Sequence, residues 1–258
     1  MQRHCTYSVS EVAATVGVHP NTVRLYEELS FISKPKRKSN GYRVYTDLHV
    51  GQLKFARLAL RAEILQHGLR KQALACIKLS ATKQFDKAIE ATLCYEKLIE
   101  SELSRARSAI SAVQSLLERD GNPDDRVLTR KATATYLGVT IDTLRNWELN
   151  GLLKVKRKKN GYRLYDGEDL KRLTIIRTLR SANYSLMAIL RLLNHLDEQS
   201  CDSLEEVLNT PSGAEDIISV CDRLLVSLEA TKTDIQQMRS LLSVLQTISE
   251  PSTETPEL

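Results

Sequence analysis

The chain of 258 residues contains the same block twice, and this repeat constrains the fold more than any other feature. The first copy covers residues 8–45 and the second covers residues 129–165. Identical residues recur in the same order, first 121 and then 120 positions apart: Gly17/Gly138, Thr22/Thr143, Arg24/Arg145, Glu27/Glu148, Asn40/Asn160, Gly41/Gly161, Tyr42/Tyr162, Arg43/Arg163 and Tyr45/Tyr165. This many ordered identities indicate a tandem duplication, so we expect both copies to adopt the same fold.

The charge of the chain follows the repeat. The whole chain has 37 Lys and Arg against 32 Asp and Glu, a formal charge of +5. Residues 1–80 carry 13 basic and 5 acidic residues, residues 126–196 carry 15 and 5, and the remainder is acidic. Two basic modules of this kind favour binding to a polyanion, and the alternative is a basic face that is only solvated. Aromatic residues make up only 5%, which argues against an all-β fold.

Each copy begins with the pattern of a helix-turn-helix. In the first copy Ser8 and Glu11 have the spacing of a capping box, which predicts a short helix ending near Val16. Gly17, like Gly138 in the second copy, supplies the turn. Pro20 fits the first turn of a second helix, which we expect to end near Leu29. Apolar residues are expected to pack the two helices together: Val12, Val16, Val18, Val23 and Leu29.

A basic stretch with a central Asn40-Gly41 pair follows the two helices. Asn-Gly is a strong signal for a hairpin turn, so residues 34–45 predict a short two-stranded wing with cations at its tip and outer face. An isolated hairpin is marginally stable, so the wing has to lean on the helices, helped by the apolar Phe31 and Ile32. Two further helices are predicted at about 47–60 and 66–79, with counterparts at 167–181 and 186–196.

Each copy is followed by a long helix with the three-and-four spacing of a coiled coil. The first seam is Ile89, Thr92, Glu96, Ile99, Leu103, Ala106, Ile110, Val113 and Leu117, and the second is Ile217, Cys221, Leu224, Leu228, Thr231, Ile235, Met238, Leu242 and Leu245. Neither helix can bury its seam alone. The sequence therefore predicts a mainly α protein in which two winged modules are each followed by a long helix, and the long helices pair as an antiparallel coiled coil.

The predicted segments follow from these patterns. They are a first module at 1–80, a long helix at 84–119, a linker at 120–126, a second module at 127–197, a connector at 198–213, a second long helix at 214–248 and a disordered tail at 249–258. The tail is rich in Pro, Ser, Thr and Glu, a composition that cannot form a core.

These features together resemble those of the MerR family of bacterial transcription factors. The matching pieces of the first copy are Gly17-Val18, residues 22–27 and residues 41–45, and those of the second are Gly138-Val139, residues 143–153 and residues 161–165. A helix-turn-helix alone is a weak signal, but the same helix, a Gly-Tyr-Arg wing and a terminal long helix in one order form a strong one. The chain departs from the family in carrying two modules and in having Leu25-Tyr26 and Asn146-Trp147 where two aromatic residues usually stand.

The resemblance implies a DNA-binding role. In the family the second helix enters the major groove, the wing and helix residues grip phosphates, and dimers form through an antiparallel coiled coil. Such proteins activate promoters with an overlong spacer by bending and untwisting the DNA. The residues expected to contact DNA are Asn21, Thr22, Arg24, Tyr26, Lys36, Arg37, Lys38, Tyr42 and Arg43 in the first module, and Thr143, Arg145, Trp147, Lys156, Arg157, Lys158, Lys159, Tyr162 and Arg163 in the second.

The chemistry of these side chains supports different roles. Arg24 and Arg145 lie near the start of a groove helix, where a guanidinium can bind a guanine edge or a phosphate through two hydrogen bonds. Wing cations supply charge, which gives affinity and little sequence choice. The alternative for Arg24 is a salt bridge to Glu27 or Glu28. The alternative for Tyr42 and Tyr45 is packing of the wing on the helices, which we favour for Tyr45.

Other chemistries find little support in the sequence. Five scattered cysteines and the absence of a long apolar segment favour a protein of the reducing cytoplasm, with no secretion and no membrane association. Cys94 lies near the start of the first long helix and Cys221 on the second seam, and seam cysteines are usually buried apolar residues, so no metal site is predicted. Because no nucleotide-binding or catalytic motif appears, we expect neither enzymatic activity nor a cofactor.

Three functions remain open at this stage. The favoured one is a promoter-binding regulator, with double-stranded DNA and RNA polymerase as partners. The second is an architectural DNA-bending protein that acts in excision or chromosome organisation. The third is a ligand-sensing protein in which one module has become a binding pocket; the sequence does not name an effector.

The duplication also predicts the assembly. A linker of ~7 residues spans at most ~24 Å, which allows both long helices to pair within one chain. We therefore favour a monomeric pseudo-dimer over a homodimer. Its two groove helices differ at His19/Thr140, Pro20/Ile141, Asn21/Asp142, Leu25/Asn146 and Tyr26/Trp147, so the operator is expected to be an imperfect palindrome.

Overall fold

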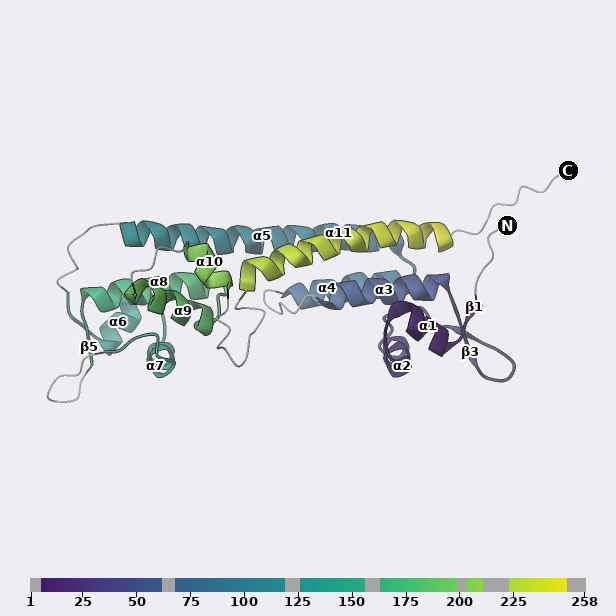
Figure 1. Ribbon diagram of the computed structural model, residues 1–258, viewed down its shortest axis with the longest axis horizontal. Helices are drawn as coiled ribbons and strands as arrows, with labels where there is room; N and C mark the ends of the chain where they lie inside the picture. Colours follow the sequence, from purple (N-terminus) through teal and green to yellow (C-terminus); the bar gives the residue numbers. More distant parts are fainter. Residues whose placement is uncertain are drawn as a thin grey trace. The chain divides into compact units, whose positions relative to one another are not determined.

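The computed structural model describes residues 6–61, 68–118, 126–155, 163–198, 203–210 and 223–249. The protein is mainly α-helical, as predicted, and divides into two compact units. Unit 1 comprises residues 1–100 and 229–258, and unit 2 comprises residues 101–228. Each unit contains one copy of the repeat and part of each long helix, α5 (Phe85–Glu118) and α11 (Leu224–Ser249) (Figure 1). The predicted tail beyond Ser249 and all of the predicted linker except Arg126 lie outside the described residues.

The helix-turn-helix of unit 1 consists of α1 (Val9–Val16) and α2 (Pro20–Glu28). The predicted capping box is present, because Ser8 and Glu11 each accept a hydrogen bond from the other's backbone N–H. Gly17 ends α1 with a φ of 68°, a left-handed conformation that glycine adopts without strain. Pro20 occupies the first position of α2. Local hydrogen bonding and backbone preference therefore fix both helix boundaries.

The packing between α1 and α2 follows the prediction except at one residue. Val12, Val16 and Val23 are buried in the core, and Val18 packs against it. Leu29 is 46% exposed, so its predicted place between the helices was wrong. The reason is that α2 ends at Glu28 and Ser30 has a φ of 56°, which turns the chain away from the packed face at Leu29.

The wing is part of a three-stranded antiparallel sheet. Strand β3 (Arg43–Thr46) pairs on one side with β2 (Lys36–Arg37), which forms the predicted hairpin, and on the other side with β1 (Thr6–Tyr7), which the sequence did not predict. The turn closes where Asn40-Gly41 predicts it, with the Gly41 N–H donating to the Lys38 carbonyl at 2.9 Å and a φ of 82° at Gly41. The extra strand anchors the hairpin to the start of α1.

Helices α3 (Asp47–Arg61) and α4 (Leu69–Ala81) pack against each other, and α3 also packs against α1 of the helix-turn-helix. Their bounds agree with the prediction to within three residues. The fully buried Gln52 joins them: its amide donates to the Ser80 carbonyl at 2.7 Å, and its oxygen accepts from the N–H and hydroxyl of Ser33. Because the buried Gln52 amide makes hydrogen bonds to both Ser33 and Ser80, the loop after α2, which contains Ser33, is held at a fixed position on α3.

The second half of α11 lies along the first part of α5 in unit 1 (Figure 1). Three polar pairs join the helices in antiparallel order: Gln246 donates to Asp86 at 3.0 Å, Arg239 pairs with Glu96 at 2.8 Å and Lys232 pairs with Glu100 at 2.7 Å. The α11 seam residues Thr231, Ile235, Met238, Leu242 and Leu245 are all buried. Coiled-coil packing of these helices stays a prediction.

The same part of α11 also contacts α3. Arg61 pairs with the buried Asp234 at 2.8 Å. A Cβ atom on Gly51 would stand only 2.5 Å from the Cδ2 atom of Leu245, so the absence of a side chain at this position allows the close approach. The C-terminal helix is thus packed against the first module of its own chain.

Unit 2 repeats the helix-turn-helix with different caps. Strand β4 (Leu128–Thr129) leads into α6 (Arg130–Leu137), Gly138 ends it with a φ of 65°, and α7 (Ile141–Leu149) follows. The N-caps are Thr129 and Thr140 in place of Ser8 and His19. Strand β5 (Leu164–Tyr165) pairs with β4, as β3 pairs with β1 in unit 1.

The remaining helices of unit 2 are α8 (Gly167–Ser181), α9 (Leu186–Asp197) and α10 (Leu204–Asn209). The first two agree with the predicted 167–181 and 186–196. Helix α10 lies in the stretch predicted as a connector and packs on α9, where Arg191 donates to the carbonyls of Val207 and Leu208. Asn183 donates to Glu102 on α5 at 3.3 Å, which ties the turn between α8 and α9 to the long helix.

One buried histidine makes the stability of unit 1 depend on pH. The Nδ1 atom of His49 accepts the Thr46 N–H at 3.0 Å, while its buried Nε2 atom has no partner among the described residues. Burial, together with the charge of Lys83, lowers the pKa of His49 to about 4. The unfolded chain, with an ordinary histidine pKa of ~6.5, binds the proton more readily, so protonation favours unfolding.

We expect the free energy of unfolding to fall as the pH drops below ~6.5, by up to ~1.4 kcal/mol per pH unit from this residue. Urea unfolding between about pH 6.5 and pH 5 measures the slope while most carboxylates stay ionised. A His49→Asn variant keeps a hydrogen-bond acceptor without the titration and should have a shallower slope. Equal slopes for both proteins would contradict the assignment.

Candidate nucleic-acid interface

The exposed face of α2 presents two of the predicted DNA-contacting side chains. Asn21 and Arg24 are exposed and joined by a hydrogen bond of 2.7 Å from the guanidinium to the amide oxygen, and Thr22 is half-buried. Among the described residues Arg24 has no ion pair, so the alternative of a salt bridge to Glu27 or Glu28 does not hold. The amide orients the arginine and leaves the rest of its guanidinium open to solvent.

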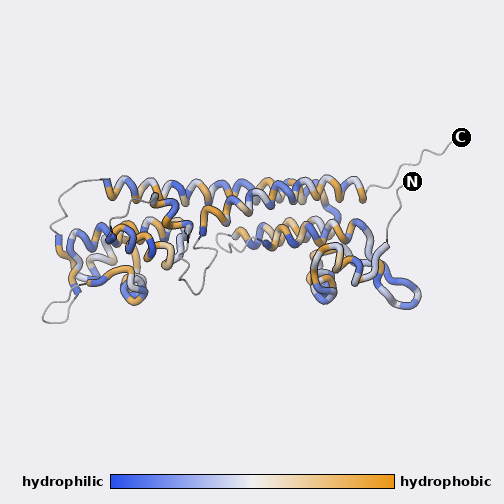
Figure 2. The backbone as a smooth tube through the Cα atoms, in the orientation of Figure 1, coloured by the Kyte–Doolittle hydropathy of each residue, from blue (hydrophilic) through white to orange (hydrophobic). Residues whose placement is uncertain are grey.

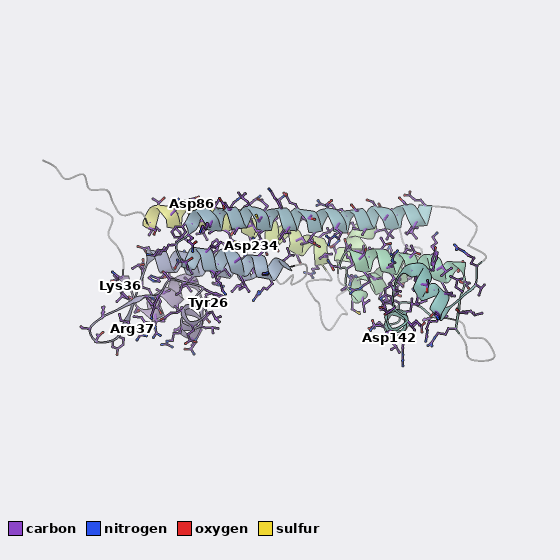
Figure 3. The ribbon with its side chains drawn as sticks, turned by 180° about the vertical axis from the view of Figure 1, so that it is seen from behind. Tyr26, Lys36, Arg37, Asp86, Asp142 and Asp234 are labelled. Carbon is purple, nitrogen blue, oxygen red and sulfur yellow. The ribbon has the colours of Figure 1, made fainter. Side chains whose placement is uncertain are left out.

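The hairpin carries the predicted wing cations on its surface. Lys36, Arg37 and Lys38 are exposed, and Figure 3 labels the first two on β2. Figure 2 shows this hairpin as mostly hydrophilic. Tyr42 is 72% exposed, whereas Tyr45 is completely buried. The preferred interpretation of Tyr45 as a packing residue is confirmed, and Tyr42 is open to solvent instead of packed on the helices.

An open cleft of about 890 Å³ lies between the hairpin and α1. Arg24 enters its lining from α2, Lys38 and Tyr42 from the hairpin, and residues 6–11 form the opposite wall. Among the described residues of the lining, Glu11 is the one carboxylate, and the capping box engages it; hydrogen bonds from Ser8 lower its pKa. The cleft therefore gathers cations and hydrogen-bond donors in a form that suits a phosphate group.

A carboxylate at the end of α2 links this helix to the wing. Glu27 pairs with the Nε atom of Arg43 on β3 at 2.7 Å and accepts a hydrogen bond of 3.4 Å from the Tyr45 hydroxyl. Burial, with the nearby Glu27 charge, raises the pKa of Tyr45 to about 12, so the hydroxyl remains a donor. Arg43, predicted to contact phosphate, is engaged within the protein through one of its nitrogens.

The same link is stronger in unit 2. Glu148 pairs with Arg163 at 2.8 Å and with Arg130 at 2.8 Å, and it accepts a hydrogen bond from the Tyr165 hydroxyl. The hydrogen bond with Tyr165 contributes most to raising the pKa of Arg130. The first copy has Val9 at the position of Arg130. The sequence analysis did not predict that Glu27 and Glu148 join the groove helix to the wing. The recurrence of this glutamate and of the wing arginine in both copies could have indicated the ion pair.

The exposed face of α7 differs from that of α2. Arg145 is exposed and has no partner among the described residues, and Thr143 shares a hydrogen bond of 2.8 Å with Thr140. Asp142 is also exposed and takes the place of Asn21, so this arginine lacks the neighbouring amide (Figure 3). An exposed carboxylate beside Arg145 reduces the local attraction for phosphate.

The two aromatic residues of the groove helices are less accessible than predicted. Tyr26 is half-buried and packs edge-on against Phe31, with 5.5 Å between ring centroids. Trp147 is only 5% exposed. Burial of this indole favours a packing role over a contact with phosphate. Lys156, Arg157, Lys158, Lys159 and Tyr162, also predicted to contact DNA, lie outside the described residues.

Three further observations concern metal ligands, cysteines and membrane-spanning helices. Over the described ranges, no group of three or more His, Cys, Asp or Glu side chains is placed to hold a metal ion. Cys94 is exposed and Cys76 is buried, and burial raises the pKa of the Cys76 thiol to about 12. In the same described part of the chain, we find no helix with the length and apolar character needed to span a bilayer.

Both copies of the repeat match known protein-family models. The model described as "MerR family regulatory protein" matches residues 8–45, and the one described as "MerR HTH family regulatory protein" matches residues 128–196. The polypeptide therefore contains two MerR-family modules, one in each unit.

Individual curated proteins resemble part of the chain. The HTH-type transcriptional regulator CueR of Escherichia coli O157:H7 is 38% identical over 52 residues, 20% of this chain and 38% of that protein. The HTH-type transcriptional regulator ZntR homolog of Haemophilus influenzae is 38% identical over 77 residues, 30% of this chain and 56% of that protein. The mercuric resistance operon regulatory protein of Bacillus cereus is 39% identical over 49 residues, 19% of this chain and 37% of that protein.

The chain thus spans between 37% and 56% of the length of these relatives. No solved structure matches the chain significantly.

The contact between Glu27 and Arg43 leads to a stability prediction. We expect Glu27→Gln to lower the free energy of unfolding by about 1–3 kcal/mol, because it leaves a partly buried guanidinium without its counter-charge. Chemical denaturation measures this loss, and hydrogen exchange should show faster opening of the β2–β3 hairpin. Glu28→Gln, the same change at the exposed neighbour, is the control and should cost less than about 0.5 kcal/mol. Equal losses for the two variants would show that the ion pair does not hold the wing.

Proposed function

We propose that the chain is a sequence-specific DNA-binding regulator of transcription. The observation that carries the proposal is that an exposed arginine occupies the same position on the second helix of each helix-turn-helix, Arg24 and Arg145. In unit 1 this arginine lines a cleft together with Lys38 and Tyr42 of the hairpin. The names of the related proteins as transcriptional regulators add support.

The proposed contacts divide into two kinds. Arg24 and Arg145 read base edges in the major groove, with Asn21, Thr22 and Thr143 beside them. Lys36, Arg37, Lys38 and Tyr42 bind the phosphate backbone, and we propose the same for the wing of the second module. Arg43 and Arg163 act chiefly by positioning the wing through Glu27 and Glu148.

We further propose that one chain forms the two-fold unit by itself. Support comes from unit 1, where the C-terminal helix packs on the first module through Arg61 and Asp234 and through Gly51 and Leu245. Three polar pairs then join it to α5 in antiparallel order. The apolar residues Ile235, Met238, Leu242 and Leu245 of α11 are thus buried by helices of the same polypeptide. We propose that a second copy is not needed to bury them.

A protein with two DNA-binding modules in one chain is suited to a promoter with two half-sites. We propose that binding of one module to each half-site bends and untwists the intervening DNA, and that this deformation regulates transcription. RNA polymerase is the proposed partner at the promoter. The two modules present different helices, as Asn21 and Asp142 illustrate, so the half-sites are expected to differ. An architectural role would instead predict binding at recombination or dispersed sites, which chromosomal mapping of the bound sites distinguishes.

The groove and wing roles make separable predictions for DNA affinity. On a site selected from a random duplex library, Arg24→Ala or Arg145→Ala should weaken binding about tenfold or more and relax sequence choice, since a bidentate base contact is worth ~1–3 kcal/mol. Lys38→Ala should weaken binding to all duplexes alike and lower the slope of log affinity against log salt by up to ~1. Both effects are measured by fluorescence anisotropy at several salt concentrations.

A different pattern would overturn these roles. If Lys38→Ala changed the preferred sequence while Arg24→Ala and Arg145→Ala left it intact, the assignment of groove and wing would be wrong. If no duplex were bound in preference to the starting library, the proposed function itself would fail. Lys171→Ala, an exposed lysine on α8 outside the proposed contacts, is a control and should leave affinity nearly unchanged.

The single-chain unit predicts the mass in solution. Light scattering of the purified protein should give about 29.1 kDa, the mass of one chain, at all concentrations tested. Addition of a duplex with both half-sites should give a complex of one chain with one duplex. A mass of two chains that persists on dilution would contradict the pseudo-dimer and indicate exchange of α11 between copies.

A further inference from the structure

A second cleft in unit 1 has no part in the proposed DNA contacts made by the wing. It measures about 580 Å³ and lies where α2, α3 and α11 meet. Val16, Leu58 and Leu241 contribute apolar surface to its lining, and Gln237 on α11 adds an amide. A volume of this size is typical of small-molecule sites, and the lining combines this apolar surface with polar and charged side chains.

Three polar side chains line this cleft without forming hydrogen bonds to one another. The Tyr26 hydroxyl, the Lys54 ammonium and the Gln237 amide have no hydrogen-bond partner among the described residues. Tyr26 is half-buried, and burial raises its pKa, so the hydroxyl stays protonated and can donate. Three donors from three different helices are therefore available to one ligand.

Two arginines add positive charge to the same lining. Arg57 donates through one nitrogen to the Val16 carbonyl and lies beside the turn of the helix-turn-helix, and Arg61 pairs with Asp234. Each guanidinium has five N–H donors, so both keep unused ones. Among the residues that the structure describes, the lining contains Lys54, Arg57 and Arg61 and no carboxylate. This excess of cations selects an anion, and the apolar surface selects one with an apolar body.

The corresponding cleft of unit 2 lacks this character. Its volume is similar, about 630 Å³, but its lining includes Asp142. Thr174 stands at the position of Lys54 and returns its hydroxyl to the Leu170 carbonyl at 2.8 Å, and Ser181 stands at the position of Arg61. Arg177 is retained and lies 3.7 Å from where a Cβ on Gly138 would be, as Arg57 does near Gly17. The scaffold is therefore common to both copies, but the described lining of the second cleft combines Arg177 and Arg180 with Asp142, whereas that of the first has three cations without a carboxylate.

We propose that this cleft binds a small organic anion that combines an acidic group, such as a carboxylate or sulfonate, with an aromatic or aliphatic body. The acidic group contacts Lys54 and Arg57, and the apolar body lies against Leu58 and Leu241. The ligand would bridge the recognition helix, through Tyr26, and the C-terminal helix, through Gln237; Figure 3 labels Tyr26 on α2 and Asp234 on α11. The proposal does not rest on DNA binding.

The test uses the full chain and the fluorescent anion anilinonaphthalenesulfonate. We expect saturable binding of one probe per chain. Lys54→Glu should raise the dissociation constant about tenfold or more, because it reverses the charge next to the bound acid. Lys171→Glu, the same charge change on the equivalent helix of unit 2, should leave it within about twofold. Tyr26→Phe, which removes only the hydroxyl, should weaken binding by a smaller factor.

Competition experiments identify the chemistry of the ligand. Naphthoate should displace the probe, whereas naphthol, which has the ring without the charge, and sulfate, which has the charge without the ring, should do so about tenfold less well. Unfolding curves should show that Lys54→Glu remains folded, because Lys54 is an exposed side chain without a partner among the described residues.

Three results would overturn the proposal. The first is binding of several probes per chain with an affinity that Lys54→Glu does not change. The second is displacement by sulfate as effective as that by naphthoate, which would indicate a site for inorganic anions. The third is displacement by any DNA duplex together with an equal loss of DNA affinity in Lys54→Glu, which would place these cations on the DNA backbone.

Discussion

The apolar stripe of α11 has to be covered, and unit 1 depends on the way in which α3 and α5 cover it. Ile235, Met238 and Leu242 are fully buried, and Leu245 is 1% exposed. Burying a side chain of this size contributes roughly 1.5–3 kcal/mol, whereas an exposed ion pair contributes about 1 kcal/mol or less. The apolar contacts therefore hold the helix, and pairs such as Arg239 and Glu96 set its direction and register. Residues from both ends of the chain thus form one compact unit.

Within each module, one carboxylate decides how the wing is placed. Glu27 and Glu148 stand near the end of the second helix, where each meets a wing arginine and a buried tyrosine. A partly buried carboxylate needs these partners, because an unpaired charge in that position is costly. The link turns the hairpin and the helix into one surface. In unit 2 Glu148 also pairs with Arg130, so this carboxylate makes one more ion pair than Glu27 does among the described residues.

The two copies have kept their scaffold and changed their surfaces. The turns at Gly17 and Gly138 have almost the same backbone, and the arginines that lie beside them are equivalent. By contrast, Leu149 is 75% exposed where the first copy has Glu28, and Lys54 and Arg61 of the cleft are replaced by Thr174 and Ser181 in the second copy. A duplicated module can diverge at such positions without loss of stability, because exposed residues contribute little to folding. The two modules are therefore suited to different ligands or different DNA sequences.

The sequence by itself determined the local features of the fold. The capping box at Ser8, the turn at Gly17 and the hairpin at Asn40-Gly41 depend on hydrogen bonds and backbone angles within a few residues, so their patterns predict them directly. The repeat predicted which side chains recur, and thus the exposed Arg24 and Arg145. Tertiary structure alone decided the pairing of β1 with β3, the engagement of Arg43 by Glu27, the exposure of Leu29 and the contact of Asp234 with Arg61. These contacts join residues far apart in the chain or depend on where a helix stops, and no local pattern encodes the distance between such side chains.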